Sequence, residues 1–120
     1  MFTLSSTHKF YLYTDATDMR KSFDGLSGLI EEFRELTTSK VSTVFVFINK
    51  RRDKIKLLHW TGGGYVLYYK PLEEGNFELP EYQVSKSMIV LNYTQMVMLI
   101  DGISILNIKR RKRYELIEKS

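Results

Sequence analysis

Residues 43–70 read TVFVFIN-KRRDK-IKLLHW-TGGG-YVLYYK, which is three apolar runs separated by two short connections. The runs at 43–49, 55–60 and 65–70 are rich in β-branched and aromatic residues, and such residues favour strands. The first connection is charged, and the second contains three glycines that can adopt the positive φ angles of a tight turn. Short connections of this kind join antiparallel neighbours. The stretch therefore predicts an antiparallel meander, which Pro71 ends.

A strand and a helix are expected before this meander. Phe10–Tyr13 is aromatic and β-prone, so it predicts a first strand. Apolar side chains then recur at spacings of 4, 3, 4 and 3 on one helix face, at Met19, Phe23, Leu26, Ile30 and Phe33. We expect this main helix to run from Asp18, as its cap, to about Leu36. Gly25 and Gly28 each cost about 1 kcal/mol against Ala inside a helix, so we expect a strand to approach closely there.

Shorter elements are expected after the meander. Phe77–Leu79 is a candidate edge strand, and Met88–Leu91 is a candidate for a further strand. Asn92 or Thr94 would cap a second helix, whose inward residues would be Met96, Leu99, Ile100 and Ile103. The predicted fold class is α+β, with an antiparallel sheet packed against one main helix and a smaller C-terminal helix. We expect one domain over residues 1–108 and a basic C-terminal tail over residues 109–120.

The composition is that of an ordinary globular chain. Of its 120 residues, 43% are hydrophobic and 27% are charged. The absence of cysteine excludes disulfides and thiolate metal sites, and it fits a reducing cytosol. The first residues lack the basic and apolar regions of a signal peptide, and no apolar run approaches the length of a membrane span. We therefore expect a cytoplasmic protein without membrane contact.

Two basic clusters are candidate nucleic-acid contacts. The first cluster surrounds the first predicted turn and contains Lys50, Arg51, Arg52, Lys54 and Lys56, opposed by Asp53. The second cluster is the run of five cations Lys109, Arg110, Arg111, Lys112 and Arg113, and the segment from Lys109 onward accounts for the whole net charge of +4. Such cations neutralise phosphates and release counterions. The alternative is that a charged turn and a charged tail are simply solvated.

Catalytic and metal sites have little support in the sequence. Asp18 and Asp24 are six residues apart, which turns them in different directions on a helix, whereas a metal-dependent nuclease needs converging carboxylates. His8 and His59 lie in separate elements without further ligands at suitable spacing, so we expect His59 to pack across strands. We predict no catalytic residue, metal or cofactor, and we expect a protein that is not an enzyme.

Aromatic residues accompany the cations of the meander. Trp60, Tyr65, Tyr68 and Tyr69 lie beside basic residues, as on sheets that stack single-stranded bases. Because neighbouring side chains of a strand point to opposite faces, some of these rings must belong to the core. We favour the core for Trp60 and keep base stacking as the minority alternative.

Several words of the chain resemble a known family. They include Asp18-Met19-Arg20-Lys21-Ser22-Phe23-Asp24-Gly25-Leu26, Val44-Phe45-Val46-Phe47-Ile48-Asn49-Lys50-Arg51-Arg52 and Lys54-Ile55-Lys56-Leu57-Leu58-His59-Trp60. These words resemble the TnpB, or Orf2-like, accessory proteins of the bacterial insertion-sequence-sixty-six transposons. The resemblance implies a small protein encoded beside a separate DDE-type transposase and needed for efficient transposition, and it assigns no catalytic residue. Arg20, Lys21 and Asp24 match the first word, and they are candidates for partner contact or for a salt-bridge network.

These observations lead to one expected function and one alternative. We expect a non-enzymatic accessory protein of DNA transposition that contacts transposon DNA, the partner transposase, or both. The two basic clusters would then supply phosphate contacts. The alternative is a protein–protein adaptor without direct nucleic-acid contact, in which the main helix and a sheet edge form the interface.

Overall fold

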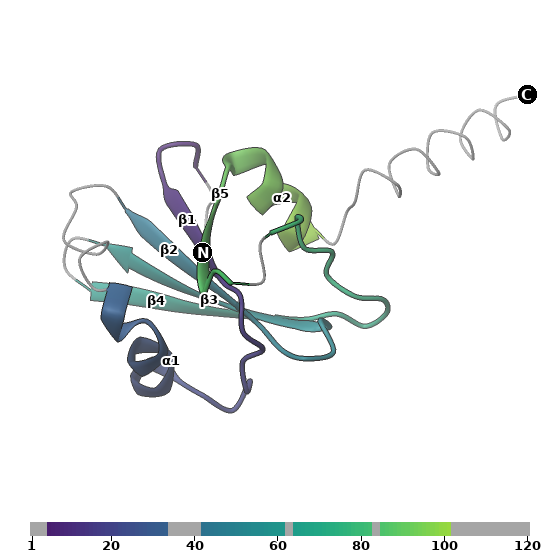
Figure 1. Ribbon diagram of the computed structural model, residues 1–120, viewed down its shortest axis with the longest axis horizontal. Coiled ribbons are helices and arrows are strands. Elements are labelled where there is room, and N and C mark those ends of the chain that lie inside the picture. Colours follow the sequence, from purple (N-terminus) through teal and green to yellow (C-terminus); the bar gives the residue numbers. More distant parts are fainter. Residues whose placement is uncertain (1–4, 34–41, 62–63, 83–84, 102–120) are drawn as a thin grey trace, which may run out of the picture.

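The computed structural model describes residues 5–33, 42–61, 64–82 and 85–101. Within these residues the chain forms a five-stranded sheet in the order β4-β3-β2-β1-β5, with two helices (Figure 1). The elements along the chain are β1 (Lys9–Tyr13), α1 (Phe23–Leu29), β2 (Thr43–Ile48), β3 (Lys54–Thr61), β4 (Gly64–Pro71), β5 (Met88–Leu91) and α2 (Tyr93–Asp101). The predicted α+β class is confirmed.

The predicted meander of three strands is also confirmed. β2 pairs antiparallel with β3, so that Thr43 lies opposite Trp60 and Ile48 lies opposite Ile55. β3 in turn pairs antiparallel with β4, which Pro71 ends. The short connections noted in the sequence therefore lead to the expected antiparallel neighbours.

The sheet as a whole is mixed, so the prediction of a purely antiparallel sheet was wrong. β1 lies parallel to β2, with Phe10 opposite Val44, and antiparallel to β5, with Phe10 opposite Leu91. The cause is the long connection between β1 and β2, which contains α1. A crossover of this length returns the chain to the end of the sheet where β1 began, and it therefore makes the two strands parallel.

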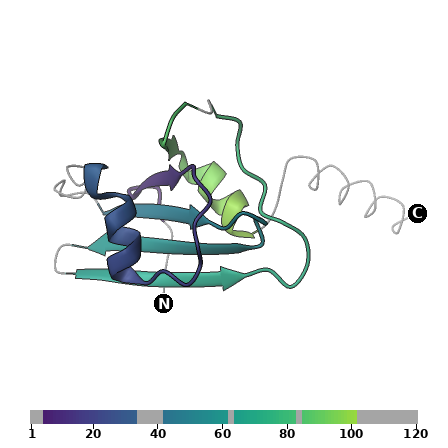
Figure 2. The same cartoon turned by 60° about the horizontal axis from the view of Figure 1, so that its bottom comes forward.

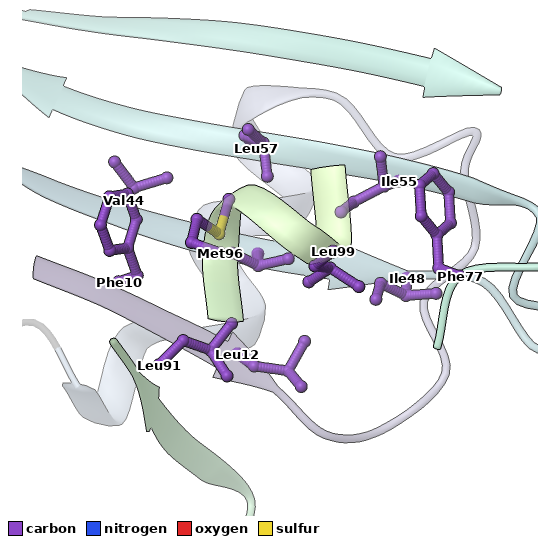
Figure 3. Packing of buried hydrophobic residues seen from close by; sticks show 11 residues of the cluster. Phe10, Leu12, Val44, Ile48, Ile55, Leu57, Phe77, Leu91, Met96 and Leu99 are labelled. Atoms are coloured by element: carbon purple, nitrogen blue, oxygen red, sulfur yellow. The ribbon is translucent and has the colours of Figure 1, made fainter. Parts of the chain in front are cut away.

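One helix covers each face of the sheet (Figure 2). On one face α2 packs into a buried cluster that contains Phe10, Leu12, Val44, Val46, Ile48, Ile55, Leu57, Phe77, Leu91, Met96 and Leu99 (Figure 3). On the other face α1 packs into a second buried cluster that contains Leu26, Ile30, Phe45, Phe47 and Leu58. Successive residues of β2 enter both clusters, so the whole strand is buried. Burial of both faces explains its uninterrupted apolar run.

The main helix is shorter than predicted, because it begins at Phe23 and not at Asp18. Asp18 lies in a turn, where its Oδ1 accepts a hydrogen bond from the backbone N–H of Arg20 at 2.9 Å. Such side-chain bonds to nearby backbone compete with helix formation. Arg20 and Lys21 consequently precede the helix and do not lie on its exposed face. The predicted end at Leu36 lies outside the described residues.

Among the described residues, no strand supplies the nearest neighbours of either glycine of α1, so that expectation was wrong as well. A Cβ atom on Gly25 would lie 3.1 Å from both Cβ and Cγ of Lys21, which precedes the helix. A Cβ atom on Gly28 would have no heavy atom within 4 Å. The crowding at Gly25 is therefore local, and Gly28 faces open space.

The second helix is capped by Asn92, one of the two caps that the sequence predicted. Its Oδ1 accepts a hydrogen bond from the backbone N–H of Gln95 at 2.7 Å, and its own N–H donates to Oε1 of Gln95 at 2.9 Å. This reciprocal pair is a capping box, which satisfies backbone donors at the start of a helix. Met96 and Leu99 face the core as expected, while Ile103 lies outside the described residues.

The segment Phe77–Leu79 forms no strand, contrary to prediction. Phe77 is 1% exposed and belongs to the cluster beneath α2, and its backbone N–H donates to the carbonyl of Arg52. The β-prone character of this segment therefore reflects a single buried ring that anchors a loop to the turn between β2 and β3.

Candidate nucleic-acid interface

A charged concave surface of the described chain lies where β1 and β2 end. Because these strands are parallel, the chain leaves both of them at the same end of the sheet. The backbone N–H of Thr17, which follows β1, donates to the carbonyl of Ile48, at the end of β2, at 2.9 Å. Together the two segments line a cavity of about 580 Å³, hereafter the basic groove, whose lining residues include Asp18, Arg20, Lys50, Arg51, Lys54 and Tyr69.

The charge of the basic groove is predominantly positive. Arg20, Lys50, Arg51 and Lys54 line it and are exposed, whereas Asp18 is the one carboxylate in its lining. These cations come from all three of the words that suggested the family resemblance: Arg20 from the first, Lys50 and Arg51 from the second, and Lys54 from the third. A concave surface with one sign of charge attracts ligands of the opposite sign.

Asp18 orients the guanidinium of Arg20. Nη2 of Arg20 lies 2.7 Å from Oδ2 of Asp18, and Nε of Arg20 also donates to the carboxylate. Hydrogen bonds from the side chain and the backbone of Arg20 hold the pKa of Asp18 at about 2. The side chain of Arg20 is nevertheless 91% exposed, so it is accessible to an anion while it is held by its partner.

The turn between β2 and β3 is organised by Asn49. Its Oδ1 accepts hydrogen bonds from the backbone N–H groups of Asp53 and Lys54, each at 3.0 Å, and its Nδ2 donates to Oδ1 of Asp53 at 2.7 Å. This last bond is the main cause of the lowered pKa of Asp53. The only acid within the turn is thus bound to Asn49, and the cations are carried on an ordered backbone.

The structure divides the first basic cluster of the sequence. Lys50, Arg51 and Lys54 line the basic groove, whereas Arg52 lines a second cavity of about 770 Å³. Arg52 also has a left-handed backbone, with φ of 57°. The acids Glu74, Glu78 and Asp101 line the same second cavity, which makes its surroundings unfavourable for a phosphate.

Lys56 has structural contacts that the sequence did not suggest. Its Nζ donates to the backbone carbonyl of Lys21 at 2.7 Å and lies 5.4 Å from the centroid of the Tyr69 ring. Among the candidate partner contacts, Arg20 lines the groove, and Asp24 is exposed in the first turn of α1. The basic run Lys109–Arg113 lies outside the described residues.

The sequence did not predict that Arg20 and Tyr69 lie in the same groove as the cations of the basic turn. The available signal for Arg20 was its place in the first family-like word, and the signal for Tyr69 was its position opposite Lys56 in the predicted hairpin. Neither signal reveals that the segment before α1 folds against the end of β2. That contact depends on the parallel pairing of β1 and β2.

The aromatic residues of β3 and β4 have different surroundings. Trp60 is partly buried against the cluster beneath α1, in agreement with the favoured prediction. Tyr65 stacks on Phe23, with ring centroids 3.6 Å apart and an interplanar angle of 7°. Tyr68 packs against the cluster beneath α2, whereas Tyr69 is 47% exposed.

The two histidines are neighbours in space. The ring centroids of His8 and His59 are 4.8 Å apart, and His59 lies opposite Val44 and Val66 in the sheet. Burial, and then the proximity of His8, lower the pKa of His59. In the described part of the chain no three His, Asp or Glu side chains gather in a way that would hold a metal ion.

The fold and this surface define a small α+β protein with a positively charged groove at one end of its sheet. The chain belongs to the family of IS66 Orf2-like proteins, whose model matches residues 8–110. It is also 29% identical over 98 residues to the uncharacterized protein y4jC of Sinorhizobium fredii (strain NBRC 101917 / NGR234), covering 82% of this chain and 81% of that protein. No solved structure gives a significant match.

Family membership confirms the resemblance seen in the sequence and places the chain among the accessory proteins of transposition. Among the described residues, neither helix has the length and apolar character needed to cross a membrane.

Proposed function

We propose that the protein acts in transposition by binding the phosphate backbone of DNA in the basic groove. The observation that supports this proposal is the convergence of Arg20 with Lys50, Arg51 and Lys54 on one concave surface. Four cations from two separate segments can neutralise several phosphates of one strand, and release of the condensed counterions then favours binding.

The positions of the four groove cations indicate which kind of DNA contact they make. Lys50, Arg51 and Lys54 come from a turn and from the first residue of β3, and Arg20 comes from a loop. Cations on loops and turns position a protein on a phosphate backbone, while sequence is read at base edges. We therefore expect salt-sensitive binding with little sequence preference. The basic tail at Lys109–Arg113 would add contacts of the same kind.

A salt series with a matched pair of lysine variants tests this function. Lys54 and Lys9 are both exposed and each begins a strand, but Lys9 lies at the opposite end of the sheet. Binding of a fluorescent DNA duplex would be measured by anisotropy from low to high salt. We expect Lys54→Gln to reduce the slope of log affinity against log salt by about 0.9, the value for one phosphate contact on a duplex, and Lys9→Gln to leave it unchanged.

Two results would count against DNA binding by the groove. A flat salt dependence for the unmodified protein would remove the phosphate contacts altogether. Equal losses for Lys54→Gln and Lys9→Gln would show that net charge, and not the groove, determines affinity.

The adaptor remains a second candidate because the sheet, within the residues that the structure describes, ends in the edge strands β4 and β5. β5 is an edge strand, and Val90 on it is 70% exposed. An exposed apolar residue on an unpaired edge suits strand addition by a protein partner. Co-purification with the neighbouring transposase, repeated after nuclease treatment, separates the two candidates. A complex that survives nuclease supports the adaptor, and one that is lost with nuclease contradicts it.

A further inference from the structure

Neither helix of the described chain is equipped to read duplex DNA. α1 has the sequence FDGLSGL and α2 has the sequence YTQMVMLID, so neither contains Lys or Arg. The first turn of α1 also carries the exposed acid Asp24. Helices that enter the major groove normally bring basic and amide side chains to base edges and phosphates. Contact with duplex DNA through α1 or α2 is therefore disfavoured.

Tyr69 gives the basic groove an aromatic wall. It belongs to the edge strand β4, lines the groove, and is 47% exposed. Lys56 lies 5.4 Å from the ring centroid, and the same Nζ is bound to the carbonyl of Lys21 at 2.7 Å. The ring is thus supported by an anchored cation while about half of the residue remains accessible.

The position of Tyr69 relative to the groove cations suits a nucleotide. Lys56 is paired with Tyr69 across the strands, and Lys54 is two residues away on the same face of β3. Diagonal neighbours of this kind lie about 7–8 Å apart in an antiparallel pair. A base in contact with the ring would therefore place its phosphate within reach of Lys54.

The other exposed tyrosine of β4 does not offer the same surface. One face of Tyr65 is already stacked on Phe23, at a centroid distance of 3.6 Å. Nζ of Lys56 lies over one face of the Tyr69 ring, so a base would stack on the other face. Tyr69 also lines the basic groove, and Tyr65 is not among the residues of that lining. Tyr69 is therefore the better candidate of the two for contact with a ligand in the groove.

We propose that the basic groove binds a single-stranded nucleic acid, with an unpaired base stacked on Tyr69 and neighbouring phosphates held by Lys54 and Arg51. This inference rests on the proposed function and specifies its ligand. Sites for single strands combine a basic channel with aromatic side chains that stack on bases of any sequence.

The test uses a cycle of protein and oligonucleotide variants. A fluorescent oligothymidine and a strand of the same length with abasic sites have the same phosphates, but only the first has bases. We expect Tyr69→Ala to weaken binding of the oligothymidine roughly tenfold, as for the loss of one stacked base, and to leave the abasic strand unaffected. Tyr69→Phe retains the ring and should bind like the unmodified protein. The slope against salt should not change, because no phosphate contact is removed.

A tyrosine on the opposite face of the sheet supplies the control. Tyr93 begins α2 and is 42% exposed, close to the exposure of Tyr69. Tyr93→Ala should leave both affinities unchanged. If Tyr69→Ala does not fold, Tyr69→Leu keeps most of the buried volume while it removes the ring. If Tyr69→Ala weakens the binding of an oligouridine RNA by the same factor, the result would support the base site and show that its ligands include RNA as well as DNA.

The outcomes separate this inference from the proposed function. Salt-dependent binding that is insensitive to Tyr69, or an equal loss of affinity for the abasic strand, would overturn the base site while leaving the phosphate contacts intact. Tighter binding of a duplex than of the single strand would also overturn it. Absence of salt-dependent binding to every probe would overturn both proposals.

Discussion

Lys56 joins β3 to the segment before α1, because its Nζ donates to the backbone carbonyl of Lys21 at 2.7 Å. A residue that the sequence presents as one cation of a basic cluster therefore holds two parts of the fold together. The same ammonium group supports the Tyr69 ring. We therefore expect Lys56 to contribute mainly to the stability of the fold and to the shape of the basic groove.

Replacement of Lys56 tests this assignment. Lys56→Met keeps most of the apolar stem but leaves the carbonyl of Lys21 without its charged donor. We expect a loss of about 1–2 kcal/mol in the free energy of unfolding, measured with urea. Lys54→Met is the matched control and should cost little, since Lys54 is exposed. Unchanged stability of Lys56→Met would show that Lys56 is no structural link.

Removal of the carboxylate from the basic groove should strengthen its attraction for anions. Asp18→Asn deletes the one acid of the lining and leaves the guanidinium of Arg20 without its charged partner. We expect tighter DNA binding and a steeper dependence on salt, as for up to about one additional phosphate contact. Asp24→Asn removes an exposed acid outside the groove lining and should have a smaller effect. Weaker binding by Asp18→Asn would show that orientation of Arg20 matters more than net charge.

The two glycines of α1 should respond differently to alanine. Gly28 faces open space, so Gly28→Ala should raise the free energy of unfolding by about 0.5–1 kcal/mol through helix propensity. In Gly25→Ala the new Cβ would lie 3.1 Å from Lys21, and this crowding should reduce or reverse the gain. Urea denaturation of both variants measures the difference. An equal gain at both positions would contradict the crowding at Gly25.

The left-handed backbone of Arg52 predicts a stabilising change. For a residue with a Cβ this conformation costs roughly 1–2 kcal/mol, while glycine adopts it readily. Because glycine also adds entropy to the unfolded chain, Arg52→Gly should stabilise the protein by less, about 0.5–1 kcal/mol. Arg51→Gly, at a position without positive φ, should be destabilising. A loss of stability for Arg52→Gly would assign a structural role to the arginine side chain.

The histidine pair predicts a dependence of stability on pH. Burial and the nearby His8 lower the pKa of His59 below its ordinary value of 6.5. The unfolded state therefore binds more protons than the native state between that value and the native pKa. Stability should be complete above about pH 6.5 and should fall as the pH drops through this window. Urea unfolding at several pH values would measure the slope, and His59→Gln should flatten it. A slope that persists in His59→Gln would assign the effect to another group.

Much of the local structure follows from local patterns. The apolar runs of β2, β3 and β4, with their short connections, predict the meander because each pairing closes only a short loop. The capping pair Asn92 and Gln95 marks the start of α2, since its hydrogen bonds join residues three positions apart. The charges of Lys50, Arg51 and Lys54 identify half of the candidate site, because exposed cations are evident in any sequence.

Two features that the sequence pattern did not predict are the start of α1 and the parallel direction of β1 and β2. Asp18 satisfies the backbone of Arg20 in a turn, so the helix begins at Phe23, although the apolar spacing continues back to Met19. The parallel pairing of β1 with β2 arises from a long crossover, whose direction no local pattern records.

The chain's own residues thus specify the meander, the cap of α2 and the basic turn, because these depend on neighbours in sequence and on exposure to water. The tertiary structure decides that Arg20 and Tyr69 join Lys50, Arg51 and Lys54 in one groove. The physical reason is that parallel β1 and β2 deliver their following segments to the same end of the sheet, where the backbone of Thr17 bonds to that of Ile48.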